Sequence, residues 1–339
     1  MASMTSAHED EAMNTADEQP IAVAGAGAWG AALAQCAAET GRRVILWGRN
    51  AETMAALGES RRHPRLRGMR LNASVECVSD PAALASAGVI VLAVPAQTVR
   101  SVHGLLMPHA AAEAPVILAA KGIERESALT MPELLAEIDP DRPFAVLSGP
   151  TFATELARSL PSAATLASRD ILLAEQLAGV FNRVTLRLYP SDDVMGVALG
   201  GAVKNVLAIA AGAVIGAGLG SNARAGVIAR GLAEMMRLGE ALGARRDTLA
   251  GLSGLGDLVL SCTDSESRNY SFGHALARGE APPDRLAEGA LTVGPLLVRA
   301  RQHDVDMPIA AAVDAVVNGG QSLSDVIATL LARPGRRET

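Results

Sequence analysis

A lysine within a long apolar stretch is the first feature of this sequence that could do chemistry. Lys204 is the only charged residue of positions 199–212, whose composition predicts a helix. On a helix, the positions three and four residues away share its face, and here they hold two glycines, a leucine and an alanine. Such small neighbours let another molecule approach the ammonium, which needs a partner when buried because its desolvation is costly. A lysine that reaches solvent past a core helix is the alternative.

A second lysine and a glycine-containing turn follow predicted strands. Lys121 ends the apolar run 115–122, and ligands of doubly wound sheets bind at the carboxyl ends of strands. We therefore expect Lys121 at a ligand site, and a solvated strand end is the alternative. The run 144–148 leads into a turn where Gly149 permits close backbone approach and Thr151 supplies a hydroxyl.

Residues 25–30 read G-x-G-x-x-G, between the apolar run 20–25 and the strong helix former 31–39. In dinucleotide-binding folds the three glycines, here Gly25, Gly27 and Gly30, serve a tight turn, room for the pyrophosphate, and helix–strand packing. The phosphates then lie at the helix N-terminus. We predict dinucleotide binding, with a plain glycine turn of another α/β protein as the alternative.

The next predicted strand, 43–47, bears on the choice of cofactor. NAD-specific sites usually place an acid at its end to bind the ribose 2′-hydroxyl, whereas Arg49 stands here and can face a 2′-phosphate. We therefore expect NADP to be accepted as well as NAD. Arg49 stacked on adenine, without selecting either cofactor, is the alternative. The basic segment 60–70 is expected to be a solvated connection.

Apolar runs alternate with helical patterns until about residue 191. Strands are predicted at 20–25, 43–47, 75–78, 88–94, 115–122, 144–148, 163–167 and 184–189, those at 20–25 and 115–122 as buried ones, and helices near 97–110, 199–212, 225–242, 293–303 and 309–317. The predicted fold class is α/β, with an N-terminal Rossmann-type doubly wound sheet followed by an all-α C-terminal domain. Residues 1–19 are expected to form a disordered tail, 20–192 the dinucleotide-binding domain and 193–339 the helical substrate-binding domain.

Composition and charge exclude several classes of protein. The 339 residues are 49% hydrophobic and only 2% aromatic, so the core is built from aliphatic side chains, and the abundant Ala and Gly suggest closely packed helices. The net charge of −6 argues against nucleic-acid binding. Neither the histidines nor the three dispersed cysteines show metal-ligand spacing, so we expect no metal and a reducing cytoplasm. The uncharged stretch 205–223 is long enough nearly to span a bilayer, but its many Gly and Ala residues favour a buried helix over membrane insertion.

Four motifs occur together along the chain: Lys-Gly at 121–122, Ser-Gly-Pro-Thr-Phe-Ala at 148–153, Gly-Ala-Val-Lys-Asn-Val at 201–206, and Gly-Leu-Gly-Asp-Leu at 254–258 followed by Ser-Arg-Asn at 267–269. With them the chain, from Ile21 to its end, resembles the NAD(P)-dependent glycerol-3-phosphate dehydrogenases of the bacterial biosynthetic type. The resemblance implies reversible reduction of dihydroxyacetone phosphate, a phosphorylated triose, to sn-glycerol 3-phosphate by NADH or NADPH, for phospholipid synthesis.

The resemblance also implies a role for each matching position. Lys204 matches the proton-transfer lysine, and Lys121 matches a lysine that touches both substrate and cofactor. The other positions that match substrate contacts are Gly149, Thr151, Asp257, Ser267, Arg268 and Asn269. Positions that match cofactor contacts, besides the three glycines and Lys121, are Ala28, Trp29, Arg49, Ala153, Arg268, Leu286 and Glu288. Neither Ala28 nor Leu286 has a side chain that could hydrogen-bond a cofactor, so they would contact it by backbone or packing.

Residue chemistry is consistent with this activity. Ketone reduction needs a hydride donor, a proton donor beside the carbonyl oxygen, and an anion site; a lysine can donate the proton when burial or a second cation lowers its pKa. Asp257 can hold Lys204 in place, and Arg268 can bind phosphate oxygens in a bidentate manner. Open alternatives are a helix cap for Asp257 and a solvated surface position for Arg268.

Other functions also stay open at this stage. They are a two-domain dehydrogenase of hydroxy acids or acyl-thioesters, and a nucleotide sensor without catalysis. The apolar, Ala-rich helices make a homodimer the expected assembly.

Overall fold

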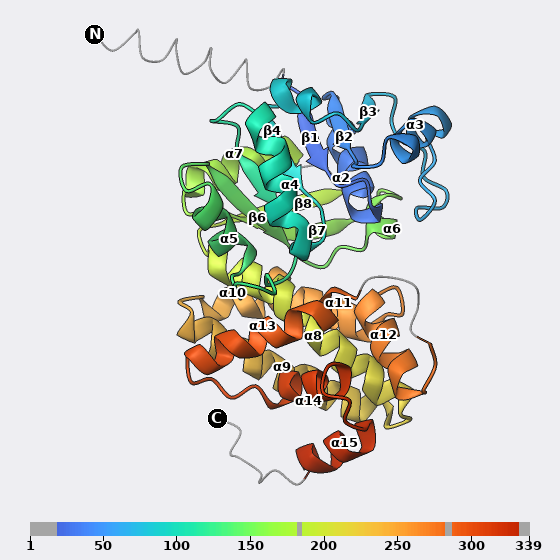
Figure 1. Cartoon of the computed structure of the whole chain (residues 1–339), viewed down its shortest axis with the longest axis vertical. Helices are drawn as coiled ribbons and strands as arrows, with labels where there is room; N and C mark the ends of the chain where they lie inside the picture. Colours follow the sequence, from blue (N-terminus) through green and yellow to red (C-terminus); the bar gives the residue numbers. More distant parts are fainter. Residues whose placement is uncertain (1–18, 182–184, 282–286, 332–339) are drawn as a thin grey trace, which may run out of the picture. The chain divides into compact units, whose positions relative to one another are not determined.

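The computed structural model describes residues 19–181, 185–281 and 287–331 (Figure 1). The chain divides into two compact units. The sheet unit comprises the chain up to Ala120 together with Leu134–Leu147 and Thr151–Asp192. The helical unit comprises Lys121–Glu133, Ser148–Pro150 and the chain from Asp193 onward. Each unit is described separately.

The sheet unit is built on one eight-stranded sheet with the order β3-β2-β1-β4-β5-β6-β7-β8. Its strands are β1 (Ile21–Ala24), β2 (Val44–Trp47), β3 (Val75–Val78), β4 (Val89–Leu92), β5 (Val116–Leu118), β6 (Phe144–Ser148), β7 (Ser162–Ala167) and β8 (Leu186–Ser191). Pairing is parallel from β3 through β6 and again between β7 and β8. The strand order reverses at β1, which has β2 on one side and β4 on the other, so the predicted doubly wound sheet is confirmed.

Continuous burial explains why the strands could be recognised in the sequence. Every residue of β1, β2, β4 and β5 is buried, as expected of parallel strands covered on both faces. These four strands are shorter than the apolar runs that predicted them. β5 ends at Leu118, so Lys121 lies three residues beyond the strand rather than at its last position. Val184, the predicted start of the last strand, lies outside the described residues.

Helices flank the sheet, with α4 drawn in front of it in Figure 1. They are α2 (Ala28–Ala38), α3 (Ala51–Ser60), α4 (Val99–Leu106), α5 (Met131–Ile138), α6 (Ala153–Leu156) and α7 (Ile171–Phe181). Segment 60–70 is a connection in which Arg62, Arg65, Arg67 and Arg70 are exposed, as expected, but it is also anchored in the core. Leu66 and Met69 are buried in the core of the sheet unit, and Arg61 donates to the carbonyl oxygens of Val75, at 2.8 Å, and Asn72.

The helical unit is organised around α8 (Val194–Gly216), which extends beyond the predicted 199–212 at both ends. The other helices are α9 (Gly220–Ala241), α10 (Arg246–Ala250), α11 (Asp257–Thr263), α12 (Arg268–Ala277), α13 (Glu288–Gln302), α14 (Pro308–Val317) and α15 (Leu323–Leu331). α8 packs against α9, α11, α12, α13 and α14. Among the described residues it is the one helix long and apolar enough to cross a membrane, yet 78% of its most apolar window is buried inside the protein. This burial is what a core helix shows.

Small residues let the helices approach closely, as the composition suggested. A Cβ atom added at Gly212 of α8 would lie 2.0 Å from the carbonyl oxygen of Tyr270 on α12. One added at Gly273 of α12 would lie 2.0 Å from the carbonyl oxygen of Ile209 on α8. Because both contacts are with backbone, the two helices can pack in this way only with glycine at these positions.

Candidate active site

Two lysines share one buried carboxylate in the helical unit. The Nζ atom of Lys121 lies 2.6 Å from Oδ2 of Asp257, and the Nζ atom of Lys204 lies 3.0 Å from Oδ1 of the same side chain. Lys204 also donates to the hydroxyl of Ser261 at 2.8 Å, and Lys121 donates to the carbonyl oxygen of Gly149 at 3.1 Å. We call Lys121, Lys204 and Asp257 the lysine pair and its carboxylate. Their formal charges sum to a single positive charge.

Separate elements bring these groups together. Lys204 is in the middle of α8, Asp257 is the first residue of α11, and Ser261 follows it by one helical turn. A Cβ atom added at Gly201 would lie 2.6 Å from the hydroxyl oxygen of Ser148 and 3.3 Å from Cγ of Lys121. The small residues beside Lys204 therefore make room for the protein's own side chains.

The electrostatics of the cluster differ from those of a surface ion pair. Burial lowers the pKa of Lys121, and neighbouring Lys204 lowers it further, while Asp257 acts in the opposite direction. Burial would raise the pKa of Asp257, but the two ammonium groups outweigh it and hold that pKa below its usual value. Asp257 is 1% exposed, so it is an ionised carboxylate held in place by two cations.

The structure decides one alternative that the sequence left open. Asp257 does not cap a helix, because the N-cap position of α11 is Gly256 and the carboxylate bonds to the two lysines instead. A π-helical turn, Leu252–Gly256, precedes it, and π-helical turns are frequent at functional sites. Nothing in our sequence analysis indicated this turn.

The sequence analysis did not identify the hydroxyls of Ser261 and Ser148, and it did not use the fact that the chain has only two lysines. Ser261 binds Lys204, and the buried hydroxyl of Ser148 has no hydrogen-bond partner among the described residues. Lys121 and Lys204 are the only lysines among 30 basic residues, the rest being arginine. A buried lysine can give up its proton, whereas arginine stays charged in proteins. The chain therefore uses lysine only where two of them meet a buried carboxylate.

The predicted phosphate-binding run, Ser267 to Asn269, lies at the start of α12. Ser267 is the N-cap, and its hydroxyl accepts from the backbone N–H of Tyr270 at 3.3 Å. The side chain of Asn269 donates to Asn205 of α8 at 2.8 Å and accepts from the N–H of Gly289 at 2.9 Å. Asn269 thus joins α12 to α8 and α13, and Arg268 between the two is exposed.

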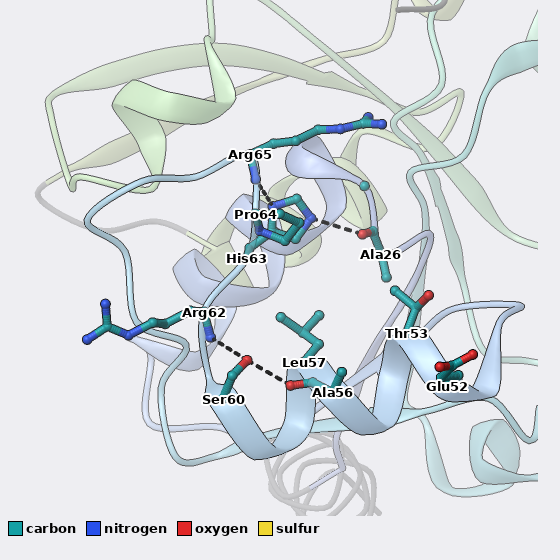
Figure 2. A pocket seen from close by; sticks show the side chains of 11 residues that line it. Ala26, Glu52, Thr53, Ala56, Leu57, Ser60, Arg62, His63, Pro64 and Arg65 are labelled. Atoms are coloured by element: carbon teal, nitrogen blue, oxygen red, sulfur yellow. Dashed lines mark hydrogen bonds between the residues drawn. The ribbon is translucent and has the colours of Figure 1, made fainter.

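The glycine turn of the sheet unit has the form that a dinucleotide needs. Gly25 has a φ of +115°, and a Cβ at Gly30 would lie 1.8 Å from the carbonyl oxygen of Gly25. Nothing lies within 4 Å of a Cβ added at Gly27, which leaves open space at the start of α2. Ala26 and Gly27 also line a cavity of about 490 Å³ (Figure 2). The residues of this turn therefore fit a bound dinucleotide.

The remaining predicted positions are spread over both units. Ala28 and Trp29 begin α2, where the indole of Trp29 donates to Ala119 at 3.2 Å. Arg49 is exposed just after β2 and does not line the cavity. Thr151 and Ala153 belong to the sheet unit, Glu288 begins α13, and Leu286 lies outside the described residues. Within the described ranges no three His, Cys, Asp or Glu residues are grouped to hold a metal ion.

A doubly wound sheet with this glycine turn, followed by a helical unit in which two lysines share a buried carboxylate, is typical of dinucleotide-dependent oxidoreductases. The family models for the N-terminus and the C-terminus of NAD-dependent glycerol-3-phosphate dehydrogenase match residues 20–174 and 193–328. The chain therefore belongs to the NAD-dependent glycerol-3-phosphate dehydrogenase family, and it is an oxidoreductase that uses NAD or NADP.

Individual relatives agree with this assignment. The glycerol-3-phosphate dehydrogenase (NAD(P)+) of Methylobacterium radiotolerans is 49% identical over 328 residues, covering 95% of this chain and 99% of that protein. The protein of the same name from Afipia carboxidovorans is 46% identical over 318 residues, covering 94% and 98%. The crystal structure of glycerol-3-phosphate dehydrogenase from Coxiella burnetii has a TM-score of 0.89 at 35% identity, and the match covers 94% of this chain and 100% of that one.

Proposed function

We propose that the chain reduces dihydroxyacetone phosphate reversibly to sn-glycerol 3-phosphate, with Lys204 as the group that transfers the proton. The observation that carries this proposal is the lysine pair on one buried carboxylate, in a chain of this family. When bound, the reduced nicotinamide supplies a hydride to the carbonyl carbon. The protein must supply a proton to the carbonyl oxygen and a site for the phosphate.

The lysine pair can supply the proton. In reduction, Nζ of Lys204 donates a proton to the carbonyl oxygen as the oxygen gains charge, and it regains one from solvent afterwards. Lys121 remains beside the developing oxyanion as a hydrogen-bond donor. Asp257 is a positioning residue, because its two carboxylate oxygens fix both ammonium groups. Oxidation of the alcohol uses the same groups in reverse.

The start of α12 can bind the phosphate. α12 has ten residues, and the positive end of its dipole and the backbone N–H groups of its first turn face an anion at this end. Arg268 can add bidentate hydrogen bonds, and Ser267 can donate its hydroxyl proton while its oxygen caps the helix. Asn269 contributes through its backbone N–H, because its side chain already joins three helices. Gly149 and Thr151 are proposed further substrate contacts.

The cellular setting is also a proposal. The product is the backbone of glycerophospholipids, so we place the enzyme in the cytoplasm as a supplier of lipid precursors.

A homodimer is the proposed assembly, supported by exposed apolar side chains such as Leu172, which is 63% exposed. Sedimentation of the purified chain against a monomeric standard tests the assembly.

The deciding experiment measures oxidation of NADPH and NADH by dihydroxyacetone phosphate, side by side. Turnover with this substrate is expected, and none with a 2-keto acid of similar size without phosphate. Turnover with the keto acid alone would instead favour a hydroxy-acid dehydrogenase. Cofactor binding without turnover of any ketone would favour a nucleotide sensor.

A further inference from the structure

The cavity beside the glycine turn has walls of opposite charge. One wall is the turn itself, with Ala26 and Gly27, and another is α3, which contributes Glu52, Thr53 and Leu57. The third wall is the segment 60–65, which our sequence analysis treated as a solvated connection. It brings Arg62 and Arg65 to the cavity, and no acidic residue occurs between positions 60 and 70. This segment is therefore a basic wall of the cavity, while α3 contributes the acidic Glu52.

His63 ties this basic segment to the glycine turn. Its side chain is 7% exposed, its Nε2 lies 3.2 Å from the carbonyl oxygen of Ala26, and its Nδ1 accepts from the backbone N–H of Arg65 at 3.2 Å. Because Nδ1 accepts, the ring proton is on Nε2 and donates to Ala26. Burial lowers the pKa of His63, so the ring is a neutral bridge near pH 7.

The two arginines of the cavity differ in direction. In Figure 2 the side chain of Arg65 extends toward the Ala26 side of the cavity, and that of Arg62 extends away from it. Arg65 is also the residue whose backbone His63 holds. The backbone of Arg65 is held by His63 while its exposed guanidinium lines the cavity, where it can bind a phosphate monoester with two hydrogen bonds, whereas Glu52 repels such a dianion.

We propose that Arg65, positioned by the bridge through His63 to Ala26, selects cofactors that carry a 2′-phosphate, and that Glu52 on the opposing wall opposes this selection. The inference rests on the proposed function, because it takes the occupant of the cavity to be the adenosine end of the bound dinucleotide. It explains how one chain accepts both cofactors, since the cavity holds one charge that favours the phosphate and one that disfavours it.

Binding, measured without turnover, tests the proposal. Dissociation constants of NADPH and NADH, and of the fragments 2′,5′-ADP and 5′-ADP, are determined by calorimetry on the full chain. Arg65→Ala is expected to weaken NADPH and 2′,5′-ADP roughly 10- to 100-fold, the usual range for a lost charge-assisted contact. NADH and 5′-ADP should bind within about twofold of their original constants. Glu52→Gln should tighten the binding of NADPH but not that of NADH.

Matched variants distinguish a specific contact at Arg65 from a general electrostatic effect of the basic segment. Arg67→Ala removes the same charge from an exposed position of the same segment that does not line the cavity, and it should leave all four constants unchanged. His63→Phe keeps a ring but loses both hydrogen bonds, so it should weaken NADPH as Arg65→Ala does. The double variant should then add little, because the two residues act as one unit.

Several outcomes would overturn the inference. One is that Arg67→Ala weakens NADPH binding as much as Arg65→Ala does. A second is that Arg65→Ala weakens the binding of NADH and NADPH equally. A third is that Arg49→Ala abolishes the preference between NADPH and NADH while Arg65→Ala leaves it unchanged. If His63→Phe fails to fold, the Arg65 and Arg67 variants still decide. Failure of the proposed function looks different, since the unaltered chain would then bind neither dinucleotide or reduce no triose phosphate.

Discussion

The candidate site contains lysine rather than arginine, and this matters because a lysine can release its proton whereas an arginine stays charged. One carboxylate cannot neutralise two ammonium groups, so the cluster keeps a positive charge although Asp257 is buried. Removing one partner of such a cluster leaves a buried charge uncompensated, which is strongly unfavourable. Loss of any one member is therefore expected to lower the stability of the folded chain.

Lys204→Ala tests the proton-transfer role. We expect turnover to fall by roughly 10²- to 10⁴-fold, the range usually lost with a general acid–base group, while the NADPH dissociation constant stays within about twofold. Lys204→Arg is the sharper companion, because it keeps the charge and yet holds its proton. It should retain substrate affinity without turnover. Turnover near the original value in either variant would refute the assignment of Lys204.

Asp257→Asn tests how the carboxylate sets the protonation of Lys121. Asp257 raises the pKa of Lys121 against burial and Lys204, so its removal should lower that pKa further. The alkaline limb of kcat/KM should then move to lower pH. Because the chain has only two lysines, selective ¹³Cε labelling gives two side-chain signals whose titration can be followed directly.

A control variant accompanies this titration. Asp247→Asn removes an exposed aspartate from the same unit and should move neither the limb nor the signals. An unchanged or raised Lys121 titration in Asp257→Asn, with the protein still folded by circular dichroism, would contradict the electrostatic account.

At the scale of helices, close backbone packing fixes the positions of Lys204 and Asn269. α8 and α12 meet at Gly212 and Gly273, where each would place a Cβ 2.0 Å from a carbonyl oxygen of the other helix. Asn269 and Asn205, bonded at 2.8 Å, connect the same two helices near the proposed phosphate site. A small shift between these helices would therefore move the proposed phosphate-binding turn relative to the lysine.

Gly273→Ala should lower both stability and substrate affinity. The added methyl group would clash with the carbonyl oxygen of Ile209, which is backbone and cannot change rotamer. We therefore expect a loss of about 1–3 kcal/mol in unfolding free energy and a raised KM for dihydroxyacetone phosphate. Gly226→Ala on α9 is the matched control, since nothing lies within 4 Å of its added Cβ. It should stabilise by about 0.5–1 kcal/mol, because alanine favours a helix. Equal effects of both changes in urea unfolding would argue against close packing.

For the whole molecule, the sequence predicted what is local or repeated and missed what depends on distant pairing. Predominantly apolar runs predicted all eight strand positions, and the apolar stretch around Lys204 predicted α8. The contact of Lys121 with Asp257 spans 136 positions, and no local pattern encodes it. The place of Lys121 after a predicted strand indicated a ligand site, whereas Asp257 was suggested by the family resemblance. The short helices α10 and α11 and the π-helical turn between them were missed, because segments this short have little periodicity.

The segment 60–70 shows a different limit of sequence reading. Its many arginines suggested a solvated connection, and most of them are exposed, yet the buried side chains of Leu66 and His63 also anchor the segment. A high density of charged residues predicts that most of a segment is exposed, but it does not show which few side chains are buried and anchor it. The hydrogen bond from His63 to Ala26 spans 37 positions and appears only in the folded chain.

The stability of the whole chain should depend on the protonation of Glu234. This glutamate of α9 is 2% exposed and accepts from the N–H groups of Ile309 and Ala310 at the start of α14, at 2.8 and 3.3 Å. Burial raises its pKa to about 7, Asp306 also raises it, and the two N–H groups and Arg237 oppose the shift. The folded chain therefore binds this proton more tightly than the unfolded chain.

Stability must then fall as pH rises from about 4.5, the unfolded pKa, to about 7, and stay lower above it. The contribution is at most roughly 3 kcal/mol. Glu234→Gln removes the titration, so its stability relative to the original chain should be more favourable at pH 8 than at pH 5 by up to that amount. Glu240→Gln is the control, because it alters an exposed glutamate of the same helix, paired with Arg246, and it should show no such pH difference. Urea unfolding at both pH values measures the four differences, and a Glu234→Gln effect that is equal at pH 5 and pH 8 would show that the carboxyl titrates alike in the folded and unfolded chain.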